Sequence, residues 1–290
     1  MTKSCLAVVD AVAEALLQAS TTFRPDQIRR YQEAIAAEEQ PEARWVLEQI
    51  LENASIASQQ RRPLCDDTGI PHVFVEFGTD IRIGADTEAA VREGVSQGLS
   101  ALPGRPMAVR GNDVQRLDQS AGLHPAPEDL EPAPLVFASH PGHGLRLTVL
   151  MLGGGPEIRS RTFRVFHRHD SGTVLAEVGQ WARDVSGELG CTPCVPAVGI
   201  GRTHFEATRL MLQAMKEGRL DRQNDFERAI TASVNAGGAG ALGLGGRITA
   251  LGSFVRIGPQ RASGVRIVCL RPGCCFDPRR ATVTVAAADL

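Results

Sequence analysis

Apolar residues recur at helical spacing over the first 60 residues and predict three helices there. The segment 10–19 is rich in Ala and Leu. Pro25 opens the segment 26–38, and proline suits the first turn of a helix because its fixed φ matches helical geometry. Pro41 opens a third segment, in which apolar residues follow one helical face as far as residue 57. We therefore expect a helical N-terminal part of about residues 1–60.

Beyond residue 60 the pattern changes to a mixture of strands and helices. Strands are expected at 72–77, 135–138, 145–152 and 195–200, and helices at 87–102, 174–189, after Thr203 and at 225–236. Thr203, with Glu206 three residues later, predicts a capping box. The proline-rich stretch 103–134 is expected to be a long loop.

The order of these elements favours one fold class. Strands and helices do not alternate as regular βαβ units, and strands dominate the last forty or so residues. The sequence therefore predicts an α+β fold, with a helical N-terminal layer packed on mixed β-sheets. We expect a single domain over residues 1–290, and the sequence shows no internal repeat.

Composition and charge exclude several classes of function. Apolar residues make up 43% of the chain, enough for a packed core, and the net charge is −2 with both signs spread along the sequence. The absence of a basic block argues against nucleic-acid binding. Asp10 and Glu14 interrupt the apolar N-terminal run, unlike a secretory signal, and no uninterrupted apolar run reaches membrane-spanning length. We expect a cytoplasmic protein that does not bind membranes, whose seven cysteines are thiols or metal ligands.

The cysteines offer the first candidate chemistry. Cys65, Cys191 and the Cys274-Cys275 pair each lie in a loop rich in helix- and strand-breaking residues, where reactive groups concentrate. Three thiolates from distant loops could bind one metal centre. Two alternatives remain open: Cys191 and Cys194 form a C-x-x-C that could be a redox pair, or four cysteines could bind structural zinc. The first lacks a thioredoxin-like frame, and adjacent cysteines suit zinc poorly.

Glycine loops and a pair of acids add to this list. Gly153–Gly155 follows a predicted strand, and residues 199–201 precede a predicted helix. Backbone amides in such loops can face an anion, although each loop taken alone also fits a tight turn. Asp66 and Asp67 adjoin Cys65 and could move protons beside a metal thiolate, or they could be solvated surface acids.

Taken in order, these segments resemble one family, the class I fumarases and the α subunits of L-tartrate dehydratases. The family's Cys-Gln-Asp-Thr-Gly loop corresponds to residues 65–69, and its Gly-Gly-Gly-Ser-x-x-Lys-Ser segment to 153–160. Its Cys-Pro-Pro and Gly-Ile-Gly-Gly-Thr segments correspond to 191–193 and 199–203 at the same spacing, and its third cysteine, four residues before an Arg-Arg pair, to Cys275. The resemblance covers roughly residues 10 to 285.

The resemblance implies an iron–sulfur hydro-lyase acting on a small dicarboxylate such as fumarate, malate or tartrate. A [4Fe–4S] cluster held by Cys65, Cys191 and Cys275 would leave one iron open as a Lewis acid. Asp67 is implied as a catalytic group. The groups implied in substrate binding are Asp66, Arg110, Gly154 and Gly155.

The sequence also departs from the family pattern. Asp66 replaces a glutamine, Arg159 replaces a lysine, and the stretch 260–264 lacks a histidine that the family places near the substrate. Altered spacing leaves Cys274 as an alternative third ligand. These changes favour a specialised member or a non-catalytic scaffold relative. Because the chain ends near the family's subunit boundary, we expect a separate β subunit and a hetero-oligomer.

Overall fold

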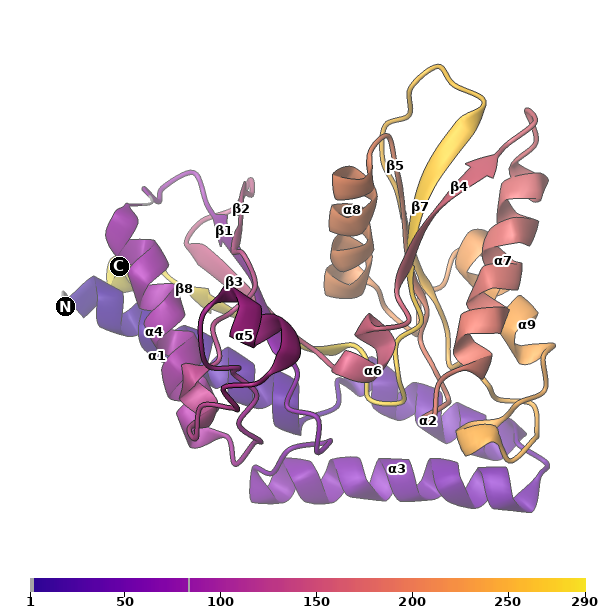
Figure 1. Cartoon of the computed structure of the whole chain (residues 1–290), viewed down its shortest axis with the longest axis horizontal. Helices are drawn as coiled ribbons and strands as arrows, with labels where there is room; N and C mark the ends of the chain where they lie inside the picture. Colours follow the sequence, from indigo (N-terminus) through magenta and orange to yellow (C-terminus); the bar gives the residue numbers. More distant parts are fainter. Residues whose placement is uncertain (1–2, 83) are drawn as a thin grey trace. The chain divides into compact units, whose positions relative to one another are not determined.

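The structure is a computed structural model that describes residues 3–82 and 84–290. Helices and two mixed sheets occur together (Figure 1), which confirms the predicted α+β class. Backbone packing divides the chain into two compact units: unit 1 comprises Met1–Thr22, Ala54–Gly154 and Arg279–Leu290, and unit 2 comprises Phe23–Asn53 and Gly155–Pro278. The single domain over residues 1–290 stays a prediction, and the first two residues of the predicted helical layer lie outside the described range.

The three predicted N-terminal helices are present. The helices are α1 (Lys3–Thr21), α2 (Pro25–Ala37), α3 (Pro41–Gln60), α4 (Ala85–Ala101), α5 (Asp113–Asp118), α6 (Gly154–Glu157), α7 (Ser171–Gly187), α8 (His204–Glu217) and α9 (Asp225–Asn235), with 3₁₀ turns η1 (Pro127–Asp129), η2 (Ala241–Gly243) and η3 (Ala287–Asp289). The strands are β1 (Ile70–Phe77), β2 (Val136–Ser139), β3 (Leu145–Leu152), β4 (Arg161–Phe166), β5 (Ala197–Gly201), β6 (Phe254–Ile257), β7 (Val265–Arg271) and β8 (Arg279–Val285).

Unit 1 is built on a sheet with the strand order β2-β1-β3-β8. Alternate residues of β1 and β3, among them Val75 and Leu147, share one apolar core with α1 and α4. These two helices therefore cover one face of the sheet. Gly94 of α4 lies against α1, where an added Cβ would be 2.7 Å from the Cβ of Val12. The missing side chain allows the two helices to approach closely.

Unit 2 is built on a sheet with the strand order β4-β7-β5-β6, covered by helices on both faces (Figure 1). Val198 and Ile200 of β5 point into a core formed with α7 and α9. Gly199 points the other way, and an added Cβ there would lie 2.0 Å from the carbonyl oxygen of Ala207 in α8. Alternation along one strand thus separates the α7–α9 face from the α8 face.

The two sheets share one topology, which the sequence did not reveal. In unit 1, β1 pairs in parallel with β2 and antiparallel with β3, and β3 pairs antiparallel with β8. In unit 2, β5 pairs in parallel with β6 and antiparallel with β7, and β7 pairs antiparallel with β4. The first, second, third and fourth strands of the two sheets therefore correspond. These strands are β1, β2, β3 and β8 in unit 1, and β5, β6, β7 and β4 in unit 2. The fourth strands are exchanged, because β3 continues into β4 and β7 continues into β8. The two connections, 153–160 and 272–278, are the segments that carry the glycine motif and the Cys274-Cys275 pair.

Three local predictions differ from the structure. The stretch 103–134 is not structureless, since it contains α5, η1 and a bridge between Val109 and Leu123. Strand β4 was not predicted, because Val165 is its one fully buried residue and its apolar pattern is weak. The capping box at α8 forms only in part. Thr203 accepts from the Glu206 amide at 3.1 Å, but the Glu206 carboxylate accepts from the amide and guanidinium of Arg202 instead.

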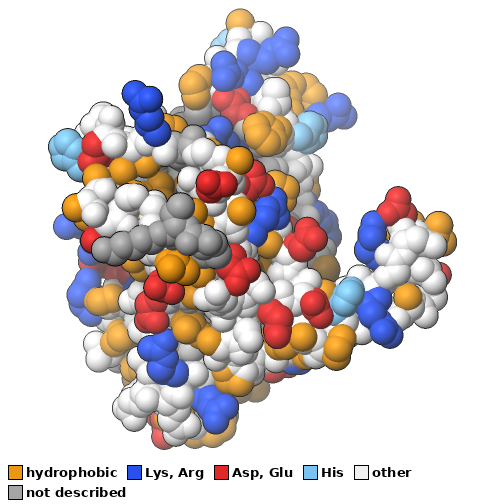
Figure 2. Space-filling model, turned by 90° about the vertical axis from the view of Figure 1, so that its left-hand side faces the viewer, with side chains coloured by type: hydrophobic (Ala, Val, Ile, Leu, Met, Phe, Trp, Pro, Cys, Tyr) orange, Lys and Arg blue, Asp and Glu red, His pale blue; other side chains and the backbone are white. Residues whose placement is uncertain are grey.

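One stretch of the described residues, Ser4–Ala37, has the length and apolar composition that could cross a membrane. It is divided into α1 and α2, and 56% of its most apolar window is buried. In unit 1, α1 supplies Val8, Val12 and Leu16 to the core, as a core helix does. On the face that Figure 2 shows, acidic and basic side chains are interspersed, in keeping with the small net charge.

Candidate functional site

The loop that carries Cys65 leads directly into β1 in unit 1. Cys65 is half-buried, and Gly69 closes the loop with φ +84°, in the left-handed region that favours glycine. A Cβ at Gly69 would also lie 2.6 Å from a guanidinium nitrogen of Arg279. Both the backbone conformation and the neighbouring arginine therefore require glycine at this position.

Asp67 is held on both of its carboxylate oxygens. Its Oδ1 accepts from the Gly69 amide at 3.1 Å, and its Oδ2 accepts from the Gly154 amide at 2.7 Å. The structure thus brings together two residues of the predicted site, Asp67 and Gly154. The Gly154 amide, predicted to face the substrate, donates to Asp67. These bonds fix the orientation of the carboxylate.

Arg279 supports the same loop from β8. It is 4% exposed, and its Nη1 donates to the carbonyl oxygens of Asp67 at 2.7 Å and Thr68 at 3.2 Å. Among the described side chains, Arg279 has no acidic partner, and its buried Nε has no hydrogen-bond partner. A buried guanidinium without a counter-charge carries a desolvation cost that a nearby anion would reduce. Sequence reasoning used Arg279 only as a landmark, because its contacts depend on the pairing of β8 with β3.

Asp66 points to a different partner from Asp67. Its carboxylate lies 3.5 Å from the Arg105 guanidinium and 3.5 Å from the Cys65 thiol, and it is largely exposed. The hydroxyl of Thr68 accepts from the Arg105 amide at 2.8 Å, which ties the two loops together. The acid that replaces the family's glutamine therefore has a basic neighbour that offsets part of its charge.

Arg110, the predicted carboxylate-binding residue, belongs to the 103–134 stretch of unit 1. Its amide donates to the carbonyl oxygen of Gly122 at 2.9 Å, which places it at the base of a loop closed by the Val109–Leu123 bridge. Its exposed guanidinium makes no hydrogen bond or ion pair with the other described residues. It is therefore available to an anion.

In unit 2, Cys191 and Cys275 come together from segments 84 residues apart (275 − 191). The Cys275 amide donates to the Cys191 carbonyl oxygen at 3.0 Å. Contact with the Cys191 thiol, then with the Cys274 thiol, together with burial, raises the pKa of Cys275 well above its usual range. Cys191 is half-buried and Cys275 is buried. Two of the three predicted ligands are thus neighbours.

Cys194 is not the partner of Cys191. It is fully buried, its thiol donates to the hydroxyl of Ser186 at 3.2 Å, and burial raises its pKa to about 12. A protonated thiol in an apolar core is a poor redox nucleophile. The C-x-x-C redox alternative is therefore disfavoured, and Cys194 acts as a core residue.

The segment 272–278 is held by one face of α2. Tyr31, fully buried, donates its hydroxyl to the carbonyl oxygen of Cys275 at 2.6 Å. Gln27 donates to the carbonyl oxygens of residues 276 and 277, and Arg24 donates to that of residue 278. Gln27 and Tyr31 are four residues apart and lie on the same side of α2, and Arg24 is the residue that directly precedes the helix. The helix thus positions the cysteine loop.

A buried ion pair holds the neighbouring Cys274. The guanidinium of Arg271 and the carboxylate of Asp277 are both nearly inaccessible, with an Nη1–Oδ2 distance of 2.7 Å. The same Oδ2 accepts from the Cys274 amide at 3.0 Å. The Cys275 amide donates to Cys191 and the Cys275 carbonyl accepts from Tyr31, so Cys275 is the member of the pair placed beside Cys191.

The donor set suits the metal centre that the family resemblance implies. All seven cysteines are free thiols, and the three predicted ligands are divided between the units, with Cys65 in unit 1 and Cys191 and Cys275 in unit 2. Within residues 3–82 and 84–290, no three His, Cys, Asp or Glu side chains form a ready-made metal site. The assignment of these ligands stays a prediction, with the chemistry of the donors in its favour.

Comparison with known proteins agrees with the motifs. The family model described as fumarate hydratase (fumerase), a family that depends on iron–sulfur clusters, matches residues 9–284. A protein of Methanocaldococcus jannaschii named "Putative L(+)-tartrate dehydratase subunit alpha" is 26% identical over 285 residues, which cover 94% of this chain and 96% of the relative. The chain belongs to the fumarate hydratase family of hydro-lyases.

Proposed function

We propose that this chain is the α subunit of a two-subunit hydro-lyase that adds or removes water on a small dicarboxylate, such as fumarate, malate or tartrate. The family match over residues 9–284 supports the reaction class. The relative named an α subunit has nearly the same extent, which supports a separate β subunit and a hetero-oligomer. The single observation that carries the chemistry is the carboxylate of Asp67, fixed by two amides in a loop whose backbone the buried Arg279 holds.

A [4Fe–4S] cluster is the cofactor that fits this donor set. Cys65, Cys191 and Cys275 would hold it. When bound, such a cluster supplies an iron without a protein ligand, which acts as a Lewis acid toward a substrate hydroxyl. The neighbouring contact of Cys191 with Cys275, and the seclusion of Cys194 in the core, support this choice of ligands.

The chain's own residues supply the remaining chemistry. Asp67 would take the proton from the carbon adjacent to the hydroxyl-bearing carbon, and return it in hydration. The Gly69 and Gly154 amides would hold the Asp67 carboxylate in one orientation throughout the reaction. Arg110, whose guanidinium makes no described contact, would bind one substrate carboxylate through a bidentate fork. Asp66 with Arg105, and Gly155, would complete the substrate contacts.

The residue at position 66 is suited to substrate selection. An acid there repels a dianion, whereas its ion pair with Arg105 reduces that effect. We therefore favour a substrate that differs from plain fumarate by a polar substituent able to contact Asp66. Exposed ion pairs are weak, so the pair can rearrange when substrate binds.

A second reading is a cluster-binding scaffold without turnover. It is favoured by one observation, the absence of histidine from the stretch 260–264. Turnover separates the two hypotheses, because a scaffold would bind iron but convert no dicarboxylate, even with the β subunit present. For either, we propose a cytoplasmic location, because seven free thiols suit a reducing compartment.

The test compares two neighbouring acids in the complex with the β subunit. Asp67→Asn should lower kcat by about 10²–10⁴-fold with unchanged iron content, because the proton acceptor is lost. Asp66→Asn is the matched control, exposed and one residue away, and should alter KM more than kcat. Turnover of malate, fumarate and tartrate would be followed by absorbance of the double bond. Unchanged kcat in Asp67→Asn would contradict the proposed role.

A further inference from the structure

A cavity of about 230 Å³ opens at the edge of the unit 2 sheet where β5 and β6 end and β7 begins. The cysteines of unit 2 lie beyond the other end of the same strands, since Cys191 precedes β5 and Cys275 follows β7. Within unit 2 the cavity is therefore separate from the cysteine loops. The proposed hydro-lyase chemistry gives it no role.

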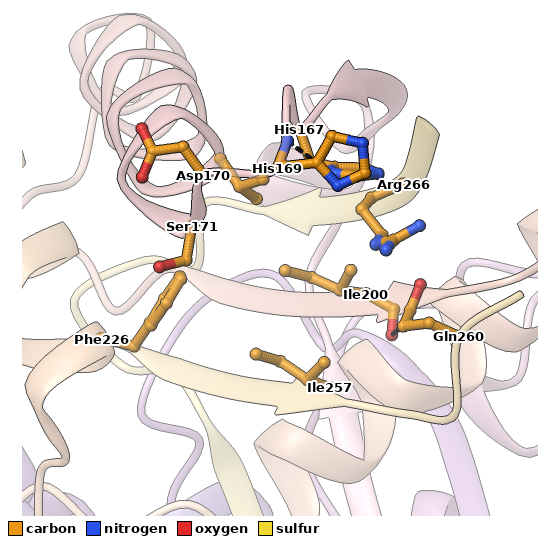
Figure 3. A pocket seen from close by; sticks show the side chains of 10 residues that line it. His167, His169, Asp170, Ser171, Ile200, Phe226, Ile257, Gln260 and Arg266 are labelled. Atoms are coloured by element: carbon orange, nitrogen blue, oxygen red, sulfur yellow. Dashed lines mark hydrogen bonds between the residues drawn. The ribbon is translucent and has the colours of Figure 1, made fainter. Parts of the chain in front are cut away.

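The floor and one end of the cavity are apolar. Ile200 and Ile257 line its middle and Phe226 one end, as Figure 3 shows, and Val174 adds a further buried wall. An engineered apolar cavity of about 150 Å³ holds one benzene molecule, so the space here suits a six-membered ring with one small substituent. The shape and lining favour a compact apolar body.

The other end of the cavity is cationic. Arg266 and Gln260 lie there (Figure 3). One guanidinium nitrogen of Arg266, Nη1, donates to the carbonyl oxygens of Ser263 at 3.0 Å and Val265 at 3.1 Å. These two bonds fix the guanidinium, and among the described residues no carboxylate pairs with it. Its other nitrogens can donate to an anion in the bidentate manner that arginine favours.

His167 and His169 also line the cavity, and hydrogen bonds on both ring nitrogens hold the His167 ring in place. The Nδ1 of His167 accepts from the His169 amide at 3.0 Å, so the ring proton lies on Nε2, which donates to the Ser263 carbonyl oxygen at 2.8 Å. His169 and Arg168 both have left-handed φ, +57° and +49°. Strained backbone of this kind, at residues other than glycine, concentrates at functional sites.

The one acid among the lining residues is already engaged. Asp170 caps α7, accepting from the amides of Gly172 at 2.9 Å and Thr173 at 3.0 Å, and from the Thr173 hydroxyl. The Asp170 carboxylate bonds groups at the start of α7. The Arg266 guanidinium is therefore the charged group that faces the cavity. The lining thus combines an apolar floor with one fixed cation.

We propose that this cavity binds a small monocarboxylate with a compact apolar or aromatic body. The body would lie over Ile200 and Ile257, and the carboxylate would pair with Arg266. The ligand is thus of a different chemical class from the dicarboxylate of the proposed reaction.

Calorimetric titration of the full chain with benzoate tests the proposal. We expect saturable binding with a Kd of roughly 1 mM or tighter, as suits a ligand of about nine heavy atoms. Benzyl alcohol, of similar shape but uncharged, should bind at least tenfold more weakly. No saturable benzoate binding, or equal binding of the alcohol, would overturn the proposal.

Variants locate the site. Arg266→Gln should weaken benzoate binding at least tenfold. Arg261 is an exposed arginine of the β6–β7 connection that does not line the cavity, so Arg261→Gln should leave binding unchanged. Ile257 lines the middle of the cavity and is 53% exposed, so Ile257→Trp should block benzoate binding by filling the space. This second variant tests the site even if Arg266→Gln unfolds the protein. Cys191→Ser should bind benzoate as the natural protein does. Loss of binding in Cys191→Ser alone would place benzoate at the cysteine site and contradict the separate cavity.

Discussion

Two cysteines separated by two residues differ sharply in their surroundings. Cys191 is half-buried beside Cys275, whereas Cys194 is buried in the core and donates to Ser186. Burial raises the pKa of Cys194 to about 12, so its thiol stays protonated near neutral pH. The chemistry of the motif therefore lies with Cys191 alone.

Alkylation measures this difference. At about pH 8.5, near the ordinary pKa of a free cysteine, iodoacetamide should label Cys65 and Cys191 of the cluster-free protein at least tenfold faster than Cys194. Protein that retains its cluster should protect Cys65 and Cys191. Mass spectrometry of peptides gives the rates. Equal labelling of Cys191 and Cys194 would contradict the assigned burial, and unprotected Cys65 in iron-loaded protein would contradict its role as a ligand.

At the residue scale, the sequence located the loops better than it located the partners within them. Cys65 and Asp67 could be predicted as site residues because they belong to a recognisable motif. The sequence could not show that Gly154 donates to Asp67 or that Arg279 supports the loop. Those contacts join residues 87 and 212 positions apart, and only the pairing of strands brings them together.

At the scale of elements, side chains on one face of α2 donate hydrogen bonds to the backbone of the cysteine loop 272–278. Tyr31→Phe removes one hydroxyl and leaves the buried Cys275 carbonyl without its donor. An unsatisfied buried group costs about 1–3 kcal/mol, so we expect lower stability and a Cys275 loop that moves more freely. The cluster should therefore bleach several-fold faster in air, which the visible absorbance would follow.

The control is Thr148→Val in unit 1. Thr148 is 2% exposed, and its hydroxyl bonds the Thr282 hydroxyl at 2.9 Å within the unit 1 sheet, away from the cysteine loops. This variant should lose stability in urea without faster bleaching. Equal bleaching rates in Tyr31→Phe and the natural protein would show that α2 does not position the loop.

The contact of α1 with α4 gives a second prediction for an element. Alanine favours a helix by about 1 kcal/mol over glycine, so propensity alone predicts that Gly94→Ala stabilises the protein. An added Cβ would, however, lie 2.7 Å from both the Val9 carbonyl oxygen and the Val12 Cβ. We expect a net loss of about 1–3 kcal/mol in the free energy of unfolding, because the helices must separate.

Gly187→Ala provides the comparison. Gly187 ends α7, and an added Cβ there meets no atom within 4 Å. This variant should be neutral or slightly stabilising in urea unfolding. If Gly94→Ala were as stable as Gly187→Ala, the close packing of α1 on α4 would be wrong.

Most elements with a buried face were predictable, whereas α5 and β4, which bury little, were not. The three N-terminal helices and the buried strands β1, β3 and β5 follow the apolar pattern of the sequence. Helix α5 has no buried residue, and β4 has one that is fully buried, so their patterns carry little signal.

At the scale of the whole molecule, the fold class could be predicted from the sequence but the topology could not. Two sheets of the same strand order exchange their fourth strands, and each unit is assembled from separate stretches of the chain. No local pattern states which sheet a fourth strand will join, since its pairing partners lie about 100 positions or more away in the sequence. The glycine segment and the Cys274-Cys275 pair both lie on the connections that carry the chain from one unit into the other.

Cys65, Cys191 and Cys275 are the residues that we propose hold an iron–sulfur cluster. The most direct measurement is the iron and acid-labile sulfide content of protein purified without oxygen, in the natural chain and in Cys191→Ser and Cys194→Ala. We expect about four irons and four sulfides per chain in the natural protein and in Cys194→Ala, and loss of the cluster in Cys191→Ser. A natural chain without iron, or a Cys191→Ser variant with full iron and sulfide content, would contradict the account.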